Sequence, residues 1–161
     1  MTPTFIPTVP NVNDDTLRAT IQRYLDLVER SSASATQNKR TLGLLLDQLA
    51  LATHASGPTV RATDREAPRR EYNAIRAEVG LRFPSYGLYR SAGTEPDDEF
   101  LVGDAIDDIT DIAMDLSGVL WLWENVGEAD ALWQFHFDFG AHWGSHLRGL
   151  QWYVHELENA G

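Results

Sequence analysis

Cysteine is absent from the 161-residue sequence. A disulfide scaffold, a thiolate metal site and a cysteine nucleophile are therefore excluded. No apolar run approaches the roughly 20 residues that a membrane span needs, so we expect no membrane association. The N-terminal residues, MTPTFIPTVPNVN, lack the basic region and apolar core of a signal peptide. These absences predict a cytoplasmic protein.

Positive charge is scarce in the second half of the chain. Residues 1–90 contain 12 Lys or Arg and 9 Asp or Glu, whereas residues 91–161 contain 1 basic and 15 acidic residues. The net charge of the whole chain is −11. Such a surface repels nucleic-acid phosphates and attracts basic proteins or divalent cations. We therefore expect no nucleic-acid partner. The acidic surface is compatible with a basic protein partner, and the alternative is that it provides solubility and pairs with the N-terminal arginines. A homodimer is also compatible with this composition.

Strand-like alternation is missing too, and apolar residues recur at helical spacing. The length and the 43% apolar content fit one domain with a core. Residues 1–12 contain three prolines and are predicted to be a flexible tail, whereas residues 13–161 are predicted to form a single helical domain. The fold class predicted is all-α, a bundle of about five helices ending in a long antiparallel helical hairpin.

The boundaries of the helices follow from caps and breakers. Loops are predicted at Ser31–Asn38, in the aromatic segment 82–89 and in the acidic segment 91–98. The first predicted helix starts at the N-cap Asn13 and ends before the loop at Ser31. The other four run from after Asn38 to near Gly57, from Pro68 to Gly80, from about Glu99 to Asn125 and from about Asp130 to Glu158.

The helix predicted from about residue 99 to 125 has an acidic face opposite an apolar face. At about 100° per residue, five carboxylates fall within an arc of about 100°. They are Asp104, Asp107, Asp108, Asp111 and Asp115. Like charges four residues apart destabilise a helix by roughly 0.2–0.5 kcal/mol per pair. We therefore expect relief from arginines such as Arg76, Arg82 or Arg90, from histidines, or from a metal ion.

The last predicted helix is rich in aromatic residues and glycines. Three glycines, Gly140, Gly144 and Gly149, are expected to allow close approach of a neighbouring backbone. The predicted core stripe consists of Leu132, Phe135, Phe139, Trp143, Leu147, Leu150 and Leu157. We expect this stripe to be widened by Trp133, Phe137, Trp152 and Tyr153.

Two histidines and an aspartate share one flank of that helix. Asp138, His142 and His146 are spaced four residues apart, and His-x-x-x-His places two imidazoles on one helical face. With a turn near residue 127, Asp115 is expected opposite Asp138, Asp111 opposite His142, and Asp107 or Asp108 opposite His146.

Oxygen and nitrogen ligands of this kind suit Zn, Mn or Fe. The candidate metal ligands are Asp108, Asp111, Asp115, His142 and His146. We assign partner or structural roles to Asp104, Asp107, Asp138 and Trp143. Two alternatives remain: Asp–His hydrogen bonds that tie the hairpin together, or no contact between the two sets.

Two segments resemble an uncharacterised bacterial family of small helical proteins, a domain of unknown function. The first is GDAIDDITDIAMDLSGVL at residues 103–120, and the second is ALWQFHFDFGAHWGSHLRGL at residues 131–150. The loop around Phe83, Pro84, Gly87 and Tyr89 matches more loosely. His136 departs from the family pattern, which has an arginine there. The resemblance implies a helical fold, and it implies no reaction.

The residues favour a non-enzymatic binding or regulatory protein with an acidic face, because no phosphate-binding glycine loop and no nucleophile with an evident base are present. The alternative is a metal-dependent hydrolase of phosphoesters or nucleotides. In that case Asp108, Asp111 and Asp115 would hold Mg, Mn or Zn, and His142 or His146 would be a ligand or general base.

Overall fold

The computed structural model describes residues 14–57, 59–91 and 101–160. The predicted tail, the N-cap Asn13, the start of a helix at Glu99 and residues 92–98 of the predicted acidic linker lie outside the described residues. The described residues confirm the predicted all-α class, with one small two-stranded sheet added to it.

Helices α1 to α4 precede the turn at Gly127, and a continuous helical segment follows it. The elements are α1 (Asp14–Arg30), α2 (Ala35–Ala55), α3 (Tyr72–Arg82), β1 (Leu88–Ser91), β2 (Leu101–Asp104), α4 (Ala105–Asn125), α5 (Glu128–Asp138), the π-helical turn η1 (Phe139–Trp143) and α6 (Gly144–Asn159). Among the described residues, none of these helices combines the length and apolar character that crossing a bilayer requires.

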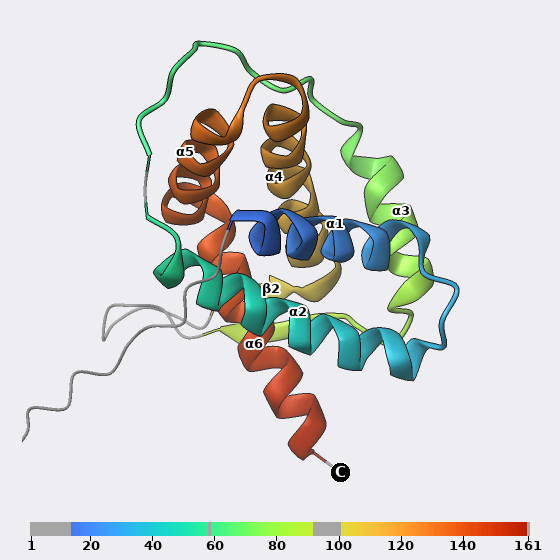
Figure 1. Ribbon diagram of the computed structural model, residues 1–161. Coiled ribbons are helices and arrows are strands. Elements are labelled where there is room, and N and C mark those ends of the chain that lie inside the picture. Colours follow the sequence, from blue (N-terminus) through green and yellow to red (C-terminus); the bar gives the residue numbers. More distant parts are fainter. Residues whose placement is uncertain (1–13, 58, 92–100, 161) are drawn as a thin grey trace, which may run out of the picture.

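Helix α4 lies at the centre of the molecule (Figure 1). It packs against α1, α3, α5 and α6, and α1 and α2 lie side by side across it. The fully buried side chains of α4, among them Ile109, Ile112 and Leu116, form the apolar face that the sequence predicts. The Tyr24 hydroxyl of α1 donates to the backbone carbonyl of Ile109 at 2.9 Å and ties the two helices together.

Two helix starts differ from the predicted ones. Helix α2 begins at Ala35, inside the predicted loop, because Ser34 and Gln37 form a capping box. Helix α3 begins at Tyr72 instead of Pro68. The residues before it form a long extended segment, which is held by the buried carboxylate of Asp130: this group accepts hydrogen bonds from the Ala62 and Thr63 backbone amides.

The sequence analysis missed the β-hairpin. Strands β1 and β2 pair in antiparallel register, with Leu88 opposite Asp104 and Tyr89 opposite Gly103. Because Leu88, Leu101 and Val102 are exposed, this short hairpin has no apolar–polar alternation to reveal it. Helix α4 consequently begins at Ala105, where the Asp104 side chain accepts from the amides of Ile106 and Asp107 as its N-cap.

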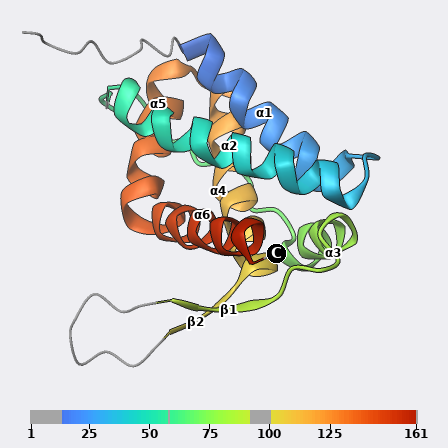
Figure 2. The same ribbon diagram turned by 90° about the horizontal axis from the view of Figure 1, so that it is seen from below.

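The final helix is not straight. It changes direction at η1, so that α6 runs across the end of α4 while α5 runs alongside it (Figure 2). In this π turn the Gly144 amide donates to the Phe139 carbonyl five residues earlier, a common cause of helix kinks. A Cβ on Gly144 would clash with that same carbonyl oxygen. The glycine therefore permits the turn within its own helix, and not the approach of a neighbouring backbone that we predicted.

Most of the predicted aromatic core is buried, with exceptions on α5 and α6. Trp143 and Phe135 are fully buried and lie 5.1 Å apart between ring centroids. Phe137, Trp152 and Leu157 are 55%, 57% and 44% exposed, respectively. These three assignments to the core or its margin were wrong. The C-terminal end of α6 extends beyond the other helices (Figure 1), which leaves its side chains less covered.

Candidate metal centre

The two ends of the acidic face of α4 contact different side chains: an arginine at one end and two histidines at the other. At the N-terminal end, Arg76 of α3 contacts Asp107 at 2.5 Å and Asp104 at 3.2 Å. The Tyr72 hydroxyl donates to Asp107 at 2.9 Å. Arg76 is one of the arginines expected to relieve the stripe, whereas Arg82 pairs with Glu78 on its own helix. We call Asp104, Asp107, Arg76 and Tyr72 the arginine end.

At the other end, two histidines face the acidic stripe. His142 of η1 contacts Asp115 through Nδ1 at 2.7 Å. His146 of α6 contacts Asp108 through Nδ1 at 2.6 Å. These contacts exclude the alternative in which the acidic and histidine sets do not meet. We call Asp108, Asp111, Asp115, His142 and His146 the histidine end.

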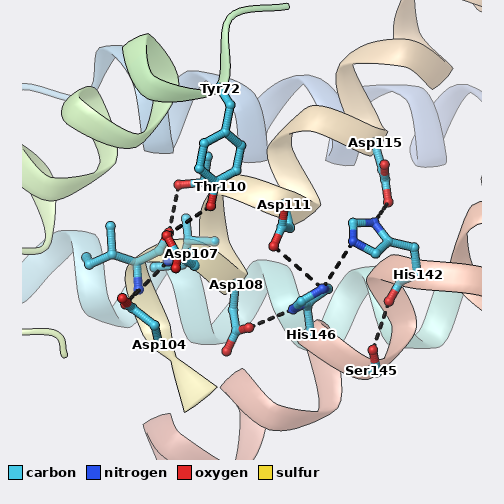
Figure 3. Close-up of polar contacts among 12 residues, drawn as sticks. Tyr72, Asp104, Asp107, Asp108, Thr110, Asp111, Asp115, His142, Ser145 and His146 are labelled. Atoms are coloured by element: carbon cyan, nitrogen blue, oxygen red, sulfur yellow. Dashed lines mark hydrogen bonds and ion pairs between the residues drawn. The ribbon is translucent and has the colours of Figure 1, made fainter. Parts of the chain in front are cut away.

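The remaining imidazole nitrogens point toward each other and toward Asp111 (Figure 3). The His142 and His146 Nε2 atoms are 3.3 Å apart, and the His146 Nε2 atom is 3.6 Å from Asp111 Oδ2. One ligand atom from each of Asp111, His142 and His146 lies within 4.8 Å of the others. Two nitrogens and one oxygen therefore converge on a single position between α4, η1 and α6.

The protonation of the histidine end differs from that of ordinary surface residues. Burial raises the pKa of Asp111 and of Asp115 above the usual range for an aspartate. Burial, together with the charge of Asp115, raises the pKa of Asp138 to about 6. The hydrogen bond to Asp108 raises the pKa of His146, against the opposing effect of its partial burial. Burial therefore disfavours the ionised forms of Asp111 and Asp115, whereas the hydrogen bond to Asp108 favours the protonated form of His146.

A tyrosine forms a hydrogen bond with one carboxylate of the histidine end. The Tyr89 hydroxyl of β1 donates to Asp108 Oδ2, so the carboxylate of Asp108 joins Tyr89 to His146. Burial is the largest cause that raises the pKa of Tyr89, and the bond to Asp108 adds to it. A Cβ on Gly103 or Gly149 would collide with this tyrosine. The two glycines therefore make room for the Tyr89 side chain.

The predicted hairpin register was displaced by up to one helical turn. His142 contacts Asp115 instead of the expected Asp111. His146 contacts Asp108, which was one of the two acids expected opposite it. Asp138 accepts from Gln134 at 2.7 Å on its own helix. Trp143 is fully buried among aromatic rings, so it is part of the core and presents no surface to a partner.

Several residues of the site were missed by the sequence analysis. Tyr72 and Tyr89 approach the stripe from α3 and β1, and no local spacing pairs them with an aspartate on α4. The π turn that carries His142 was also missed. Its only sequence signal is the density of glycines around residue 142, and π turns are frequent at functional sites.

Comparisons with known proteins place this arrangement in a family. A family model described as a domain of unknown function, DUF5063, matches residues 11–159. The chain belongs to this family. The predicted resemblance to an uncharacterised helical family is thereby confirmed, and DUF5063 carries no described activity.

A solved structure shares the fold. Protein BF1032 from Bacteroides fragilis, a structural genomics target, has a TM-score of 0.72 and 14% sequence identity, and the match covers 92% of this chain and 95% of that chain. At this identity the likeness shows the fold alone. No curated protein matches the chain. These comparisons offer no support for the hydrolase alternative.

Proposed function

We propose that this DUF5063 protein binds one divalent transition-metal ion, with Asp111, His142 and His146 as ligands. The observation that carries the proposal is the orientation of the two imidazoles. Each donates Nδ1–H to a carboxylate of α4, and each directs Nε2 toward the other and toward Asp111. The proposal makes Asp108 and Asp115 acceptors behind the ligands, whereas the sequence analysis assigned them as ligands.

The tautomers follow from the hydrogen bonds. An ionised carboxylate can only accept, so the Nδ1 atom that contacts it carries the proton. The Nε2 atom of a neutral imidazole then has a free lone pair. Metal-binding histidines generally have this arrangement, in which a carboxylate orients the ring and raises the basicity of the ligand. Asp115 and Asp108 supply it here to His142 and His146 respectively.

The separation of the donor atoms favours Zn²⁺ or an ion of similar size. Two nitrogens bound about 2.0–2.1 Å from a tetrahedral ion lie about 3.3–3.4 Å apart. The two Nε2 atoms are 3.3 Å apart. Two imidazoles and one carboxylate are also a ligand set used for Zn²⁺ and Fe²⁺. A 2+ ion would compensate the negative charge of the histidine end.

A purely structural pair of histidines is the competing interpretation. In that case a single proton between the two Nε2 atoms would hold the rings together and make one of them an imidazolium. Metal binding distinguishes the two interpretations. A metal site takes up one ion per chain, whereas a pair of histidines that shares a proton is not stabilised by Zn²⁺. The basic protein partner predicted from the charge stays a prediction, and it is independent of this site.

The test is metal analysis of untagged protein, followed by titration of metal-free protein with Zn²⁺, Mn²⁺, Fe²⁺ and Mg²⁺. We expect one Zn²⁺ per chain and a higher melting temperature with Zn²⁺, since a ligand at 100 times its Kd stabilises the folded state by about 2.7 kcal/mol. His142→Ala and Asp111→Ala should remove this rise.

His155→Ala is the matched control. His155 is an exposed histidine of α6 whose hydrogen bonds are to Asn159 on the same helix, so its removal should leave Zn²⁺ binding unchanged. The proposal is wrong if the wild type takes up no ion, or if His155→Ala lowers the affinity as much as His142→Ala does.

A further inference from the structure

A cavity of about 550 Å³ opens beside the histidine end. Asp111 and His142, two of the three proposed ligands, are among its lining residues. This volume falls within the range of pockets that hold small organic ligands. An ion held by three protein ligands keeps a further coordination position for water or an exogenous ligand. The cavity is the space into which such a ligand would extend.

The wall opposite α4 carries positive charge. It is formed by residues 66–70 of the extended segment before α3, in which Arg69 and Arg70 outnumber the one acid, Glu66. Arg70 is occupied, because it bonds Glu29 and donates to Ser117 at 2.9 Å. Arg69 is exposed, and no partner among the described residues bonds its guanidinium. The cavity is therefore lined by an available guanidinium and by two of the three proposed metal ligands.

The segment that presents Arg69 is fixed on both sides. Upstream, Asp130 accepts from the Thr63 hydroxyl at 2.5 Å, and Arg65 donates to the Asn125 carbonyl at 2.8 Å. Downstream, Arg70 is tied to Glu29 of α1. Arg69 thus lies between anchored residues, which limits the entropy lost when it orders around a ligand.

The remaining lining includes apolar surface. Met114 and Trp121 of α4 border the cavity. One face of the Trp121 ring lies under the Arg65 guanidinium, 5.1 Å from the ring centroid. Pockets with apolar walls and a few convergent polar groups are typical of small-molecule sites. The lining therefore suits a molecule with one charged end and one apolar end.

We infer that the metal-loaded protein binds a small organic anion, whose carboxylate or phosphate group coordinates the ion and contacts Arg69 while its apolar part lies against Trp121 and Met114. This inference rests on the proposed metal site. Without the ion, the carboxylates of Asp111, Asp115 and Asp138 in the same lining would repel an anion. Binding of the anion should therefore depend on the metal, and each should tighten the binding of the other.

The test uses full-length protein loaded with Zn²⁺ for calorimetry and with Co²⁺ for visible absorption, which changes when an anion enters the coordination shell. The probes are phenyl phosphate, phenylacetate, inorganic phosphate and the neutral benzyl alcohol. We expect phenyl phosphate or phenylacetate to bind, with the tighter one identifying the anionic group. Inorganic phosphate should bind at least about tenfold more weakly, because it lacks the apolar part.

Arg69→Gln should weaken binding of the preferred anion at least about tenfold, the effect of losing a charge-assisted hydrogen bond. Arg40→Gln is the control, because Arg40 is also exposed but does not line this cavity. Equal anion binding with and without metal, an unchanged affinity in Arg69→Gln, or equally tight binding of benzyl alcohol would overturn the inference.

The metal titration separates the two proposals. If Zn²⁺ binds and none of the anions alters the Co²⁺ spectrum or releases heat, the inference about the anion is wrong and the metal site stands. If no metal binds, both are wrong.

Discussion

The two ends of the acidic face of α4 meet different cations and acquire different chemistry. At the arginine end, Arg76 lies against Asp104 and Asp107. A guanidinium is permanently charged and can only donate hydrogen bonds, so one resident cation faces the two carboxylates of this end. At the histidine end, each imidazole uses one nitrogen on a carboxylate and keeps the other for a further partner. The residue opposite an aspartate therefore decides whether the carboxylate is structural or serves a binding site.

The protonation equilibria differ in the same way. Partial burial would raise the pKa of Asp107, but the hydrogen bonds from Arg76 and Tyr72 outweigh it and lower the pKa. Burial raises the pKa of Asp111 and Asp115. The hydrogen bonds from Arg76 and Tyr72 thus favour the ionised form of Asp107, whereas burial disfavours the ionised forms of Asp111 and Asp115.

The largest difference between the two ends should appear in metal affinity. Asp108→Asn disturbs the carboxylate that orients His146, and we expect about 10–100-fold weaker Zn²⁺ binding, as for other carboxylates behind a histidine ligand. Asp104→Asn also removes one charge from the stripe, but asparagine is an equally good N-cap. The Zn²⁺ affinity of Asp104→Asn should therefore remain within a few-fold of wild type when both variants are titrated with Zn²⁺ by calorimetry. Equal losses in both variants would show that only total charge matters.

The bend between α5 and α6 should be the next most sensitive feature. In Gly144→Ala the new Cβ would clash with the Phe139 carbonyl, and relief of such overpacking typically costs about 1–3 kcal/mol. Denaturant unfolding of the metal-free protein measures this cost. Zn²⁺ affinity should fall as well, because His142 lies in the same π turn.

Gly140→Ala supplies the contrast within that turn. A Cβ at Gly140 meets no atom within 4 Å, and alanine is favoured over glycine inside a helix by about 0.5–1 kcal/mol. We expect this variant to be slightly more stable than wild type. A loss of stability at both glycines would remove the special role of Gly144.

A smaller effect is expected for Asp111→Asn, which should raise the melting temperature of the metal-free protein and lower that of the Zn²⁺-loaded protein. Asp111→Asn removes a carboxylate that lies close to His146 and whose ionisation is opposed by burial. We expect the metal-free variant to melt about 1–3 °C above wild type. With saturating Zn²⁺ the order should reverse, because the variant has lost a ligand. A variant that melts lower in both states would indicate that Asp111 stabilises the fold directly.

The smallest effect should be a pH dependence at the arginine end. The folded-state pKa of Asp107 is lowered, so its stabilising contribution is present above the unfolded pKa of about 3.9 and is lost as pH falls through the folded value. Asp107→Asn should therefore cost about 0.2–1 kcal/mol at pH 7, as for an exposed ion pair. The difference from wild type should shrink in paired thermal melts as the pH falls below about 3.9, the unfolded pKa. A difference that stays constant with pH would show that the charge of Asp107 is not what stabilises the fold.

Much of the fold could be predicted because its signals are local. The two faces of α4 and the turn at Gly127 follow from helical spacing and a single breaker. The β-hairpin could not be predicted, because its apolar residues do not alternate with polar ones along the strands. The neighbours Leu101 and Val102 are both exposed, as is Leu88. The π turn at η1 could not be predicted either, because a wheel drawn for a straight helix contains no bend.

The sequence by itself determined the all-α class and the acidic face of α4, and it offered contact between that face and His142 and His146 as one of several alternatives. These follow from the period of the helix and from a hairpin turn, both of which act over a few residues. Only the tertiary structure decided which aspartates meet Arg76, which meet imidazole, and that Tyr72 and Tyr89 complete the two ends. The physical reason is that these contacts depend on how α3, β1 and α6 pack against α4, and packing is set by the whole core rather than by neighbouring residues.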